Sequence, residues 1–90
     1  MRLDNFISDL GIVKRRTVAK ELAAGGHVKI NDQRAKPAHK VKAGDVIEIS
    51  GKYRLKLKVL KVPEGGSISR GERSKYFEVL FRDSHPDLDI

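Results

Sequence analysis

A short run of cationic and hydroxyl side chains is the densest group in the sequence that could bind an anion. It consists of Lys14, Arg15, Arg16, Thr17 and, one helical turn later, Lys20. The apolar spacing around the run predicts a helix over 14–24, in which Arg16 and Lys20 share a face. Cations are unfavourable at a helix N-terminus, because the macrodipole favours acids there. The pattern therefore predicts an anion bound by guanidinium forks, backbone N–H groups and the Thr17 hydroxyl. The alternative is a solvated run of charges.

The surrounding sequence predicts the elements that position this cluster. Apolar residues at helical spacing in 3–10, ended by Gly11, predict a first helix, and Gly25-Gly26 ends the second. Alternating patterns then predict strands over 28–30, 46–49, 53–59 and 76–81, with turns at 31–32 and 43–45. Residues 35–41 form an irregular connection, 63–73 a Gly/Ser loop, and a phase slip at 59–60 predicts a bulge. The expected fold is α+β, with two helices followed by a small, mostly antiparallel twisted sheet.

The overall charge predicts a polyanionic partner. The 90 residues carry a net charge of +7, and ten Lys/Arg against four acids give residues 1–42 a net charge of +6. Residues 43–62 have a net charge of +3, and residues 63–90 have a net charge of −2. A field of one sign captures polyanions, of which nucleic acid is the commonest in a cytoplasm. The alternative is that these side chains only keep a small domain soluble.

Further cations and one amide extend the candidate surface beyond the helix. Lys29 and Asn31 lie on the next strand and turn, although Asn at such a place more often makes the turn itself. A second group could extend a phosphate track, and its members are Lys36, His39, Lys40 and Lys42. The strand over 53–59 has a cationic face, which is either a second RNA surface or an edge protected against aggregation.

Enzymatic chemistry is not expected in this chain. The three His residues have no metal-ligand spacing and Cys is absent, so we expect neither a metal site nor a disulfide. No phosphate-binding loop, dinucleotide fingerprint or nucleophile motif predicts a cofactor. The three C-terminal aromatic residues are not interleaved with the basic cluster, which favours recognition of folded RNA over stacking on single strands. We find neither a signal peptide nor a membrane-length apolar run, and expect a cytoplasmic protein.

Residues 1–49 resemble the S4 RNA-binding domain family, first described in small-subunit ribosomal protein four. The matching segments are Arg2-Leu3-Asp4, Leu10-Gly11, Arg16-Thr17 with Ala19, Gly26–Asn31, and Val41 with Gly44–Ile47. The resemblance implies that the two helices and the following hairpin form an αL motif that grips structured RNA. It places eight residues on the gripping surface: Arg2, Lys14, Arg15, Arg16, Thr17, Lys20, Lys29 and Asn31. The chain departs from the family pattern at Arg15, where Ser is frequent, and at Asp32, where Gly is usual.

The Lys-Arg-Arg-Thr run resembles the stand-alone members of this family, of the heat-shock protein 15 and RqcP type. This resemblance implies binding to 23S rRNA and tRNA on the 50S subunit, in quality control of stalled 50S–peptidyl-tRNA complexes. Two alternatives remain open: an accessory of small-subunit assembly or rRNA maturation, and the targeting half of a two-chain RNA-modifying enzyme. We expect a monomer with one domain over 1–82, comprising a core at 1–49 and a sheet extension at 50–82. A frayed acidic tail is expected over 83–90.

Overall fold

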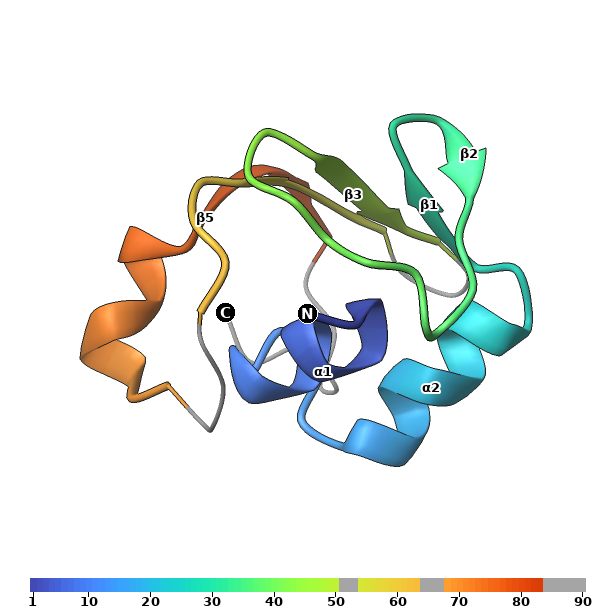
Figure 1. The fold of residues 1–90 in the computed structure, drawn as a ribbon, viewed down its shortest axis with the longest axis horizontal. Helices are drawn as coiled ribbons and strands as arrows, with labels where there is room; N and C mark the ends of the chain where they lie inside the picture. The colour runs from blue at the N-terminus through green and yellow to red at the C-terminus, as the bar shows by residue number, and fades with distance from the viewer. Residues whose placement is uncertain (51–53, 64–67, 84–90) are drawn as a thin grey trace.

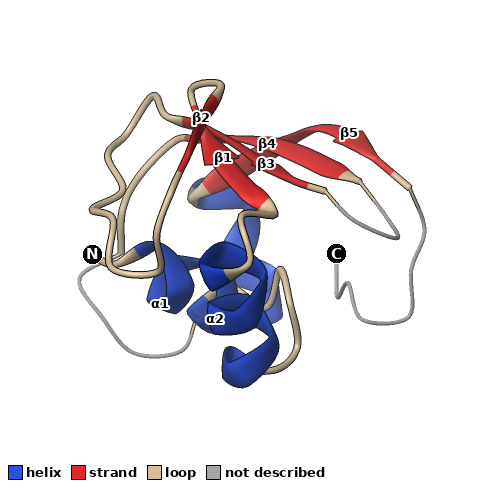
Figure 2. Cartoon of the chain, turned by 90° about the vertical axis from the view of Figure 1, so that its right-hand side faces the viewer, coloured by secondary structure: helices blue, strands red, loops and turns tan. Residues whose placement is uncertain are grey.

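A five-stranded antiparallel sheet carries two short helices on one of its faces in the computed structural model, which describes residues 1–50, 54–63 and 68–83 (Figures 1 and 2). The helices are α1 (Leu3–Asp9) and α2 (Arg16–Ala24). The strands are β1 (Val28–Ile30), β2 (Gln33–Arg34), β3 (Val46–Ile49), β4 (Leu55–Val59) and β5 (Phe77–Arg82), in the spatial order β2-β1-β3-β4-β5. This arrangement confirms the α+β prediction.

The core lies between the two helices and the inner face of the sheet. The helical spacing in α1 buries Leu3, Phe6 and Ile7 completely. Alternation along β3 and β4 turns every second side chain toward these residues, so that Ile47 and Leu57 are also fully buried. The same alternation sends the intervening charged residues to the outer face of the sheet.

The hairpin between β1 and β2 turns through two residues in the left-handed region. Asn31 has a φ of 52° and Asp32 has a φ of 69°, as a two-residue turn of a twisted hairpin requires. The Asn31 side chain donates to Asp45 Oδ1 at 3.1 Å and accepts from the Val46 backbone N–H at 3.0 Å. Asp45 is buried, and its Oδ2 accepts from the Lys42 N–H at 2.8 Å. These bonds join the hairpin to the turn before β3.

The second helix begins two residues later than predicted. Arg15 is the N-cap residue in an extended conformation (φ −114°, ψ 130°), and Lys14 precedes it. The reason lies just upstream, where Ile12 and Val13 are fully buried and their N–H groups both donate to the Ile7 carbonyl. This packing holds the connection against the core until Arg16.

The bulge lies in β5 and not at 59–60, where the sequence predicted it. Lys56 pairs with Phe81 and Leu57 pairs with Val79, so Leu80 of β5 is the extra residue. The phase slip at 59–60 instead marks the end of β4, and Leu60 is 44% exposed. β4 also pairs on both sides, which makes the interpretation of its cations as edge protection wrong.

Two short elements were not expected. The strand β2 follows directly after the hairpin turn, where only two residues pair. A 3₁₀ helix, η1 (Arg70–Lys75), occupies the end of the segment predicted as a Gly/Ser loop. Residues 51–53, the last of which begins the third predicted strand, lie outside the described residues. So do residues 64–67 of that loop and residues 84–90 of the predicted tail. Within the described part of the chain, no helix has the length and apolarity of a membrane span.

Replacing Asp32 with glycine is expected to stabilise the protein. A left-handed φ is strained for a residue with a Cβ, although Asp tolerates it better than most, and glycine adopts it freely. We predict that Asp32→Gly raises the free energy of unfolding by about 0.5–1 kcal/mol in urea denaturation. Gln33→Gly, one residue later in β2, is the control and is expected to lower it. A loss of stability in Asp32→Gly would contradict this account of the turn.

Candidate functional site

The predicted cationic cluster lies together around the start of α2. Its members, Lys14, Arg15, Arg16, Thr17 and Lys20, are all exposed. The first turn of the helix contains no acid, and no side chain caps its N-terminus. The backbone N–H groups of a helix start need acceptors, and here neighbouring cations favour an anionic one. The start of α2 therefore combines exposed cations with backbone N–H groups that an anionic acceptor could satisfy.

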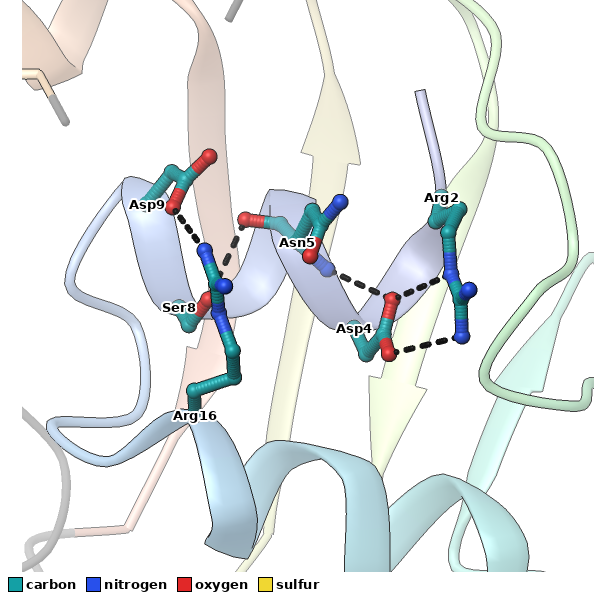
Figure 3. Close-up of polar contacts among 6 residues, drawn as sticks. All are labelled: Arg2, Asp4, Asn5, Ser8, Asp9 and Arg16. Atoms are coloured by element: carbon teal, nitrogen blue, oxygen red, sulfur yellow. Dashed lines mark hydrogen bonds and ion pairs between the residues drawn. The ribbon is translucent and has the colours of Figure 1, made fainter. Parts of the chain in front are cut away.

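Arg16 is held in place by an acid of the first helix. Its Nη2 lies 3.4 Å from Asp9 Oδ1, with 66% of the Arg16 side chain and 13% of the Asp9 side chain exposed. Figure 3 shows the guanidinium reaching from the start of α2 to the end of α1. The pair limits the movement of Arg16 while leaving most of its side chain open to solvent.

Arg2 is held more firmly, at the other end of α1 (Figure 3). Its Nε and Nη2 each donate to one carboxylate oxygen of Asp4 at 3.1 Å. The Asp4 side chain is only 6% exposed, and it also accepts from the Asn5 N–H at 2.8 Å. Half of the Arg2 side chain remains exposed. Two acids of α1 thus orient two guanidinium groups that remain accessible to a ligand.

Lys40 joins Arg2 because the connection after β2 runs beside the N-terminus. Arg2 and Lys40 form an isolated antiparallel bridge, and the Leu3 N–H donates to the His39 carbonyl at 2.8 Å. Arg2 and Lys40 thus lie at the start of α1, and the cluster around the start of α2 lies beyond its end. These residues together are called the basic helix face below: Arg2, Lys14, Arg15, Arg16, Thr17, Lys20 and Lys40.

Three of the predicted residues lie elsewhere. Lys36 is exposed and lines a hollow of about 270 Å³ with Gly25 and Gly26, near the C-terminal end of α2. Lys29 is the exposed residue between two buried neighbours of β1, so it projects from the face of the sheet opposite the helices. The side-chain amide of Asn31 is occupied by Asp45 and Val46, as described above.

Arg73 is a nearby cation that sequence reasoning missed. A Cβ built on Gly11 would lie 2.3 Å from Arg73 Cζ, so this guanidinium packs directly over the turn between α1 and α2. Gly11 has a φ of +67°, which explains why glycine both ends α1 and admits the arginine. Nothing in the local pattern around Arg73 indicates this packing, because the two residues are far apart in sequence.

Comparison with known proteins places these features in context. Residues 1–47 match the S4 domain family. The RQC P-site tRNA stabilizing factor of Streptococcus pneumoniae is 37% identical over 81 residues, which are 89% of this chain and 90% of that protein. The small ribosomal subunit protein uS4 of Thermosipho africanus is 44% identical over 54 residues, 59% of this chain and 26% of that protein. The trimeric structure of heat shock protein 15 from Vibrio cholerae superposes with a TM-score of 0.78 at 26% identity, covering 88% of this chain and 80% of that chain.

The two arginine–acid pairs are expected to differ in their effect on folding. Arg2→Ala leaves a buried carboxylate without its bidentate partner, and we predict a loss of about 1–3 kcal/mol in the free energy of unfolding. Arg16→Ala removes one long contact to a more exposed acid, and we predict a loss below about 1 kcal/mol.

Chemical denaturation of both variants measures this difference. Adding Asp4→Asn to Arg2→Ala removes the uncompensated charge and is expected to restore part of the stability. Equal losses in Arg2→Ala and Arg16→Ala would contradict the assignment of Arg2–Asp4 as the structural pair.

Proposed function

This chain belongs to the S4 domain family, and from that premise we propose that it binds structured RNA and has no catalytic activity of its own. One observation supports this most directly: Arg2 and Arg16 are oriented by acids of α1, yet half or more of each side chain is exposed. Guanidinium groups fixed in this way match phosphate oxygens with little further loss of side-chain entropy.

The binding mechanism is electrostatic and depends on shape. The cations of the basic helix face displace counterions from RNA phosphates, which supplies most of the affinity. The rigid pair of helices fixes the spacing of these cations, so that only RNA folds with a matching arrangement of phosphates make all the contacts. Lys29, Asn31 and Lys36 remain proposed RNA contacts, with Lys29 and Lys36 lying apart from the basic helix face.

We infer that the RNA is ribosomal RNA with an adjacent tRNA. The S. pneumoniae relative is named for stabilizing P-site tRNA, and it matches this chain over nearly the whole length of both proteins. The resemblance then favours 23S rRNA on the 50S subunit, in the cytoplasm, during quality control of stalled 50S–peptidyl-tRNA complexes, with the protein acting as a monomer.

The alternative of small-subunit assembly has one observation in its favour. The ribosomal protein uS4 shares 44% identity with this chain, but over only 26% of its own length. A shared RNA-binding core accounts for that match without a shared particle, so the large subunit remains our first choice. The targeting half of a two-chain modifying enzyme is a further alternative, and a stoichiometric methyltransferase or synthase in a pull-down would support it.

Gradient sedimentation of a cell lysate separates these functions. We expect the protein to migrate with 50S particles, and more so when peptidyl-tRNA accumulates on them. A variant with Lys14, Arg15 and Arg16 changed to Gln is expected to remain at the top of the gradient, because it lacks three cations of the basic helix face. Migration with 30S particles would favour the alternative.

Binding to folded RNA is expected to depend on Arg16 and on salt. With five to eight phosphate contacts, a plot of log affinity against log salt concentration has a slope of about −3.5 to −7. Arg16→Ala is expected to cost about 1–3 kcal/mol of binding free energy to an rRNA hairpin, measured by fluorescence anisotropy. Lys61→Gln, which removes one exposed cation outside the basic helix face, is the control. A slope near zero would contradict the electrostatic mechanism.

A further inference from the structure

We propose that the outer face of the sheet holds an unstacked nucleotide of the bound RNA, against Phe81 and Arg54. This inference rests on the proposed RNA-binding function and assigns a second surface to it. The helices cover the inner face of the sheet, so the proposed site and the helices lie on opposite sides (Figure 2). A protein built in this way contacts two RNA segments at once.

The strand register places four side chains in one row across the outer face. Lys29 of β1 pairs with Glu48 of β3, Glu48 pairs with Lys56 of β4, and Lys56 pairs with Phe81 of β5. Residues directly opposite each other in antiparallel strands project to the same face. Ile47 and Leu57, the neighbours in sequence, are fully buried on the inner face. The row therefore places the ring of Phe81 beside the cation of Lys56, on a surface separate from the basic cluster at the start of α2.

The Phe81 side chain is exposed to solvent, whereas the ring of Phe6 in the core is fully buried. It is 47% exposed, and the Arg54 guanidinium lies 5.6 Å from the centroid of its ring. Arg54 is itself oriented by Glu48, with Nη2 3.4 Å from Oε2. An aromatic ring and a guanidinium plane are the two surfaces on which unpaired RNA bases stack. This pair is ordered by contacts within the sheet before any ligand arrives.

Two hollows adjoin on this face. The smaller, of about 120 Å³, is lined by Glu48, Arg54, Leu55, Lys56 and Phe81. The larger, of about 330 Å³, is lined by Asn31, Asp32, Val46, Glu48, Lys56 and Leu80. Glu48 and Lys56 line both, so the two hollows are neighbours on the outer face. The smaller one offers a stacking surface, a carboxylate that can accept from a base amino group, and cations for the adjacent phosphates.

The charge of the face favours RNA over a protein partner. Among the described outer-face residues of β1, β3, β4 and β5, together with Arg54 beside β4, Lys29, Arg54, Lys56 and Lys58 outnumber Glu48 and Glu78. Lysine is depleted in the buried centres of protein–protein interfaces, where its desolvation is costly. Here Lys56 stands at the centre of the row, between Glu48 and Phe81. A phosphate backbone compensates that charge, whereas an apolar protein surface does not.

A single-stranded oligonucleotide tests the site directly. The probe is a mixed-sequence hexaribonucleotide carrying one 2-aminopurine, whose fluorescence is quenched by stacking. We expect Phe81→Leu, which keeps the apolar bulk but removes the ring, to weaken binding about tenfold and to abolish the quenching. Leu60→Ala is the control, since it changes an exposed apolar residue that has no ring and lines neither hollow. Its affinity is expected to stay within twofold of the wild type, and circular dichroism checks that both variants fold.

The same variants distinguish this inference from the proposed function. Arg16→Ala is expected to bind an rRNA hairpin more weakly and to keep the 2-aminopurine quenching, which reports contact with Phe81. If Phe81→Leu binds the hexanucleotide as the wild type does, or if the wild type does not bind it, the inference is wrong. Weaker hairpin binding by Arg16→Ala then still supports the proposed function. If the wild type binds no folded RNA, the proposed function is wrong, and the inference that rests on it is wrong as well. A change of oligomeric state in Phe81→Leu without a change in affinity would assign the face to a second copy of the chain and overturn the inference.

Discussion

The buried carboxylate of Asp4 is the constraint on which the arrangement of the basic helix face depends. A carboxylate that is almost fully removed from water must be paired, and here both of its oxygens accept from Arg2. The pairing fixes the residue before α1, and that strand-like residue in turn bridges Lys40. Asp9 repeats the arrangement with Arg16 at the other end of the helix. One seven-residue helix thereby positions cations that come from three separate segments of the chain.

Local patterns predicted the elements of the fold but not the contacts between them. The spacing of Leu3, Phe6 and Ile7 was sufficient to predict α1, because apolar residues at helical spacing form the buried face of a helix. The position of the bulge was not predictable, since it depends on how β5 pairs with β4 and not on the sequence of either strand alone. The start of α2 was misplaced for a similar reason, because the burial of Ile12 and Val13 overrides the tendency of Lys14 to be helical.

The candidate site shows the same division. The cationic run around Arg16 was predicted as a binding site because positive charge at a helix N-terminus is unfavourable. This unfavourable placement can be recognised from residues that are neighbours in sequence. The pairing of Arg2 with Asp4 and of Arg16 with Asp9 was not predicted, since it depends on the folded geometry at the two ends of α1. Arg54 and Phe81 are far apart in sequence, and only the pairing of β4 with β5 places the guanidinium over the ring.

The extra residue at Leu80 has a consequence for the behaviour of the protein in concentrated solution. β5 lies at one edge of the described sheet and reads Phe-Glu-Val-Leu-Phe-Arg, an apolar composition that is an aggregation hazard on an exposed edge. The bulge residue bends the strand and disturbs the even spacing of N–H and C=O groups with which an added strand would pair. The protection of this edge therefore lies in the backbone conformation and is independent of the lysines of β4, which is an interior strand.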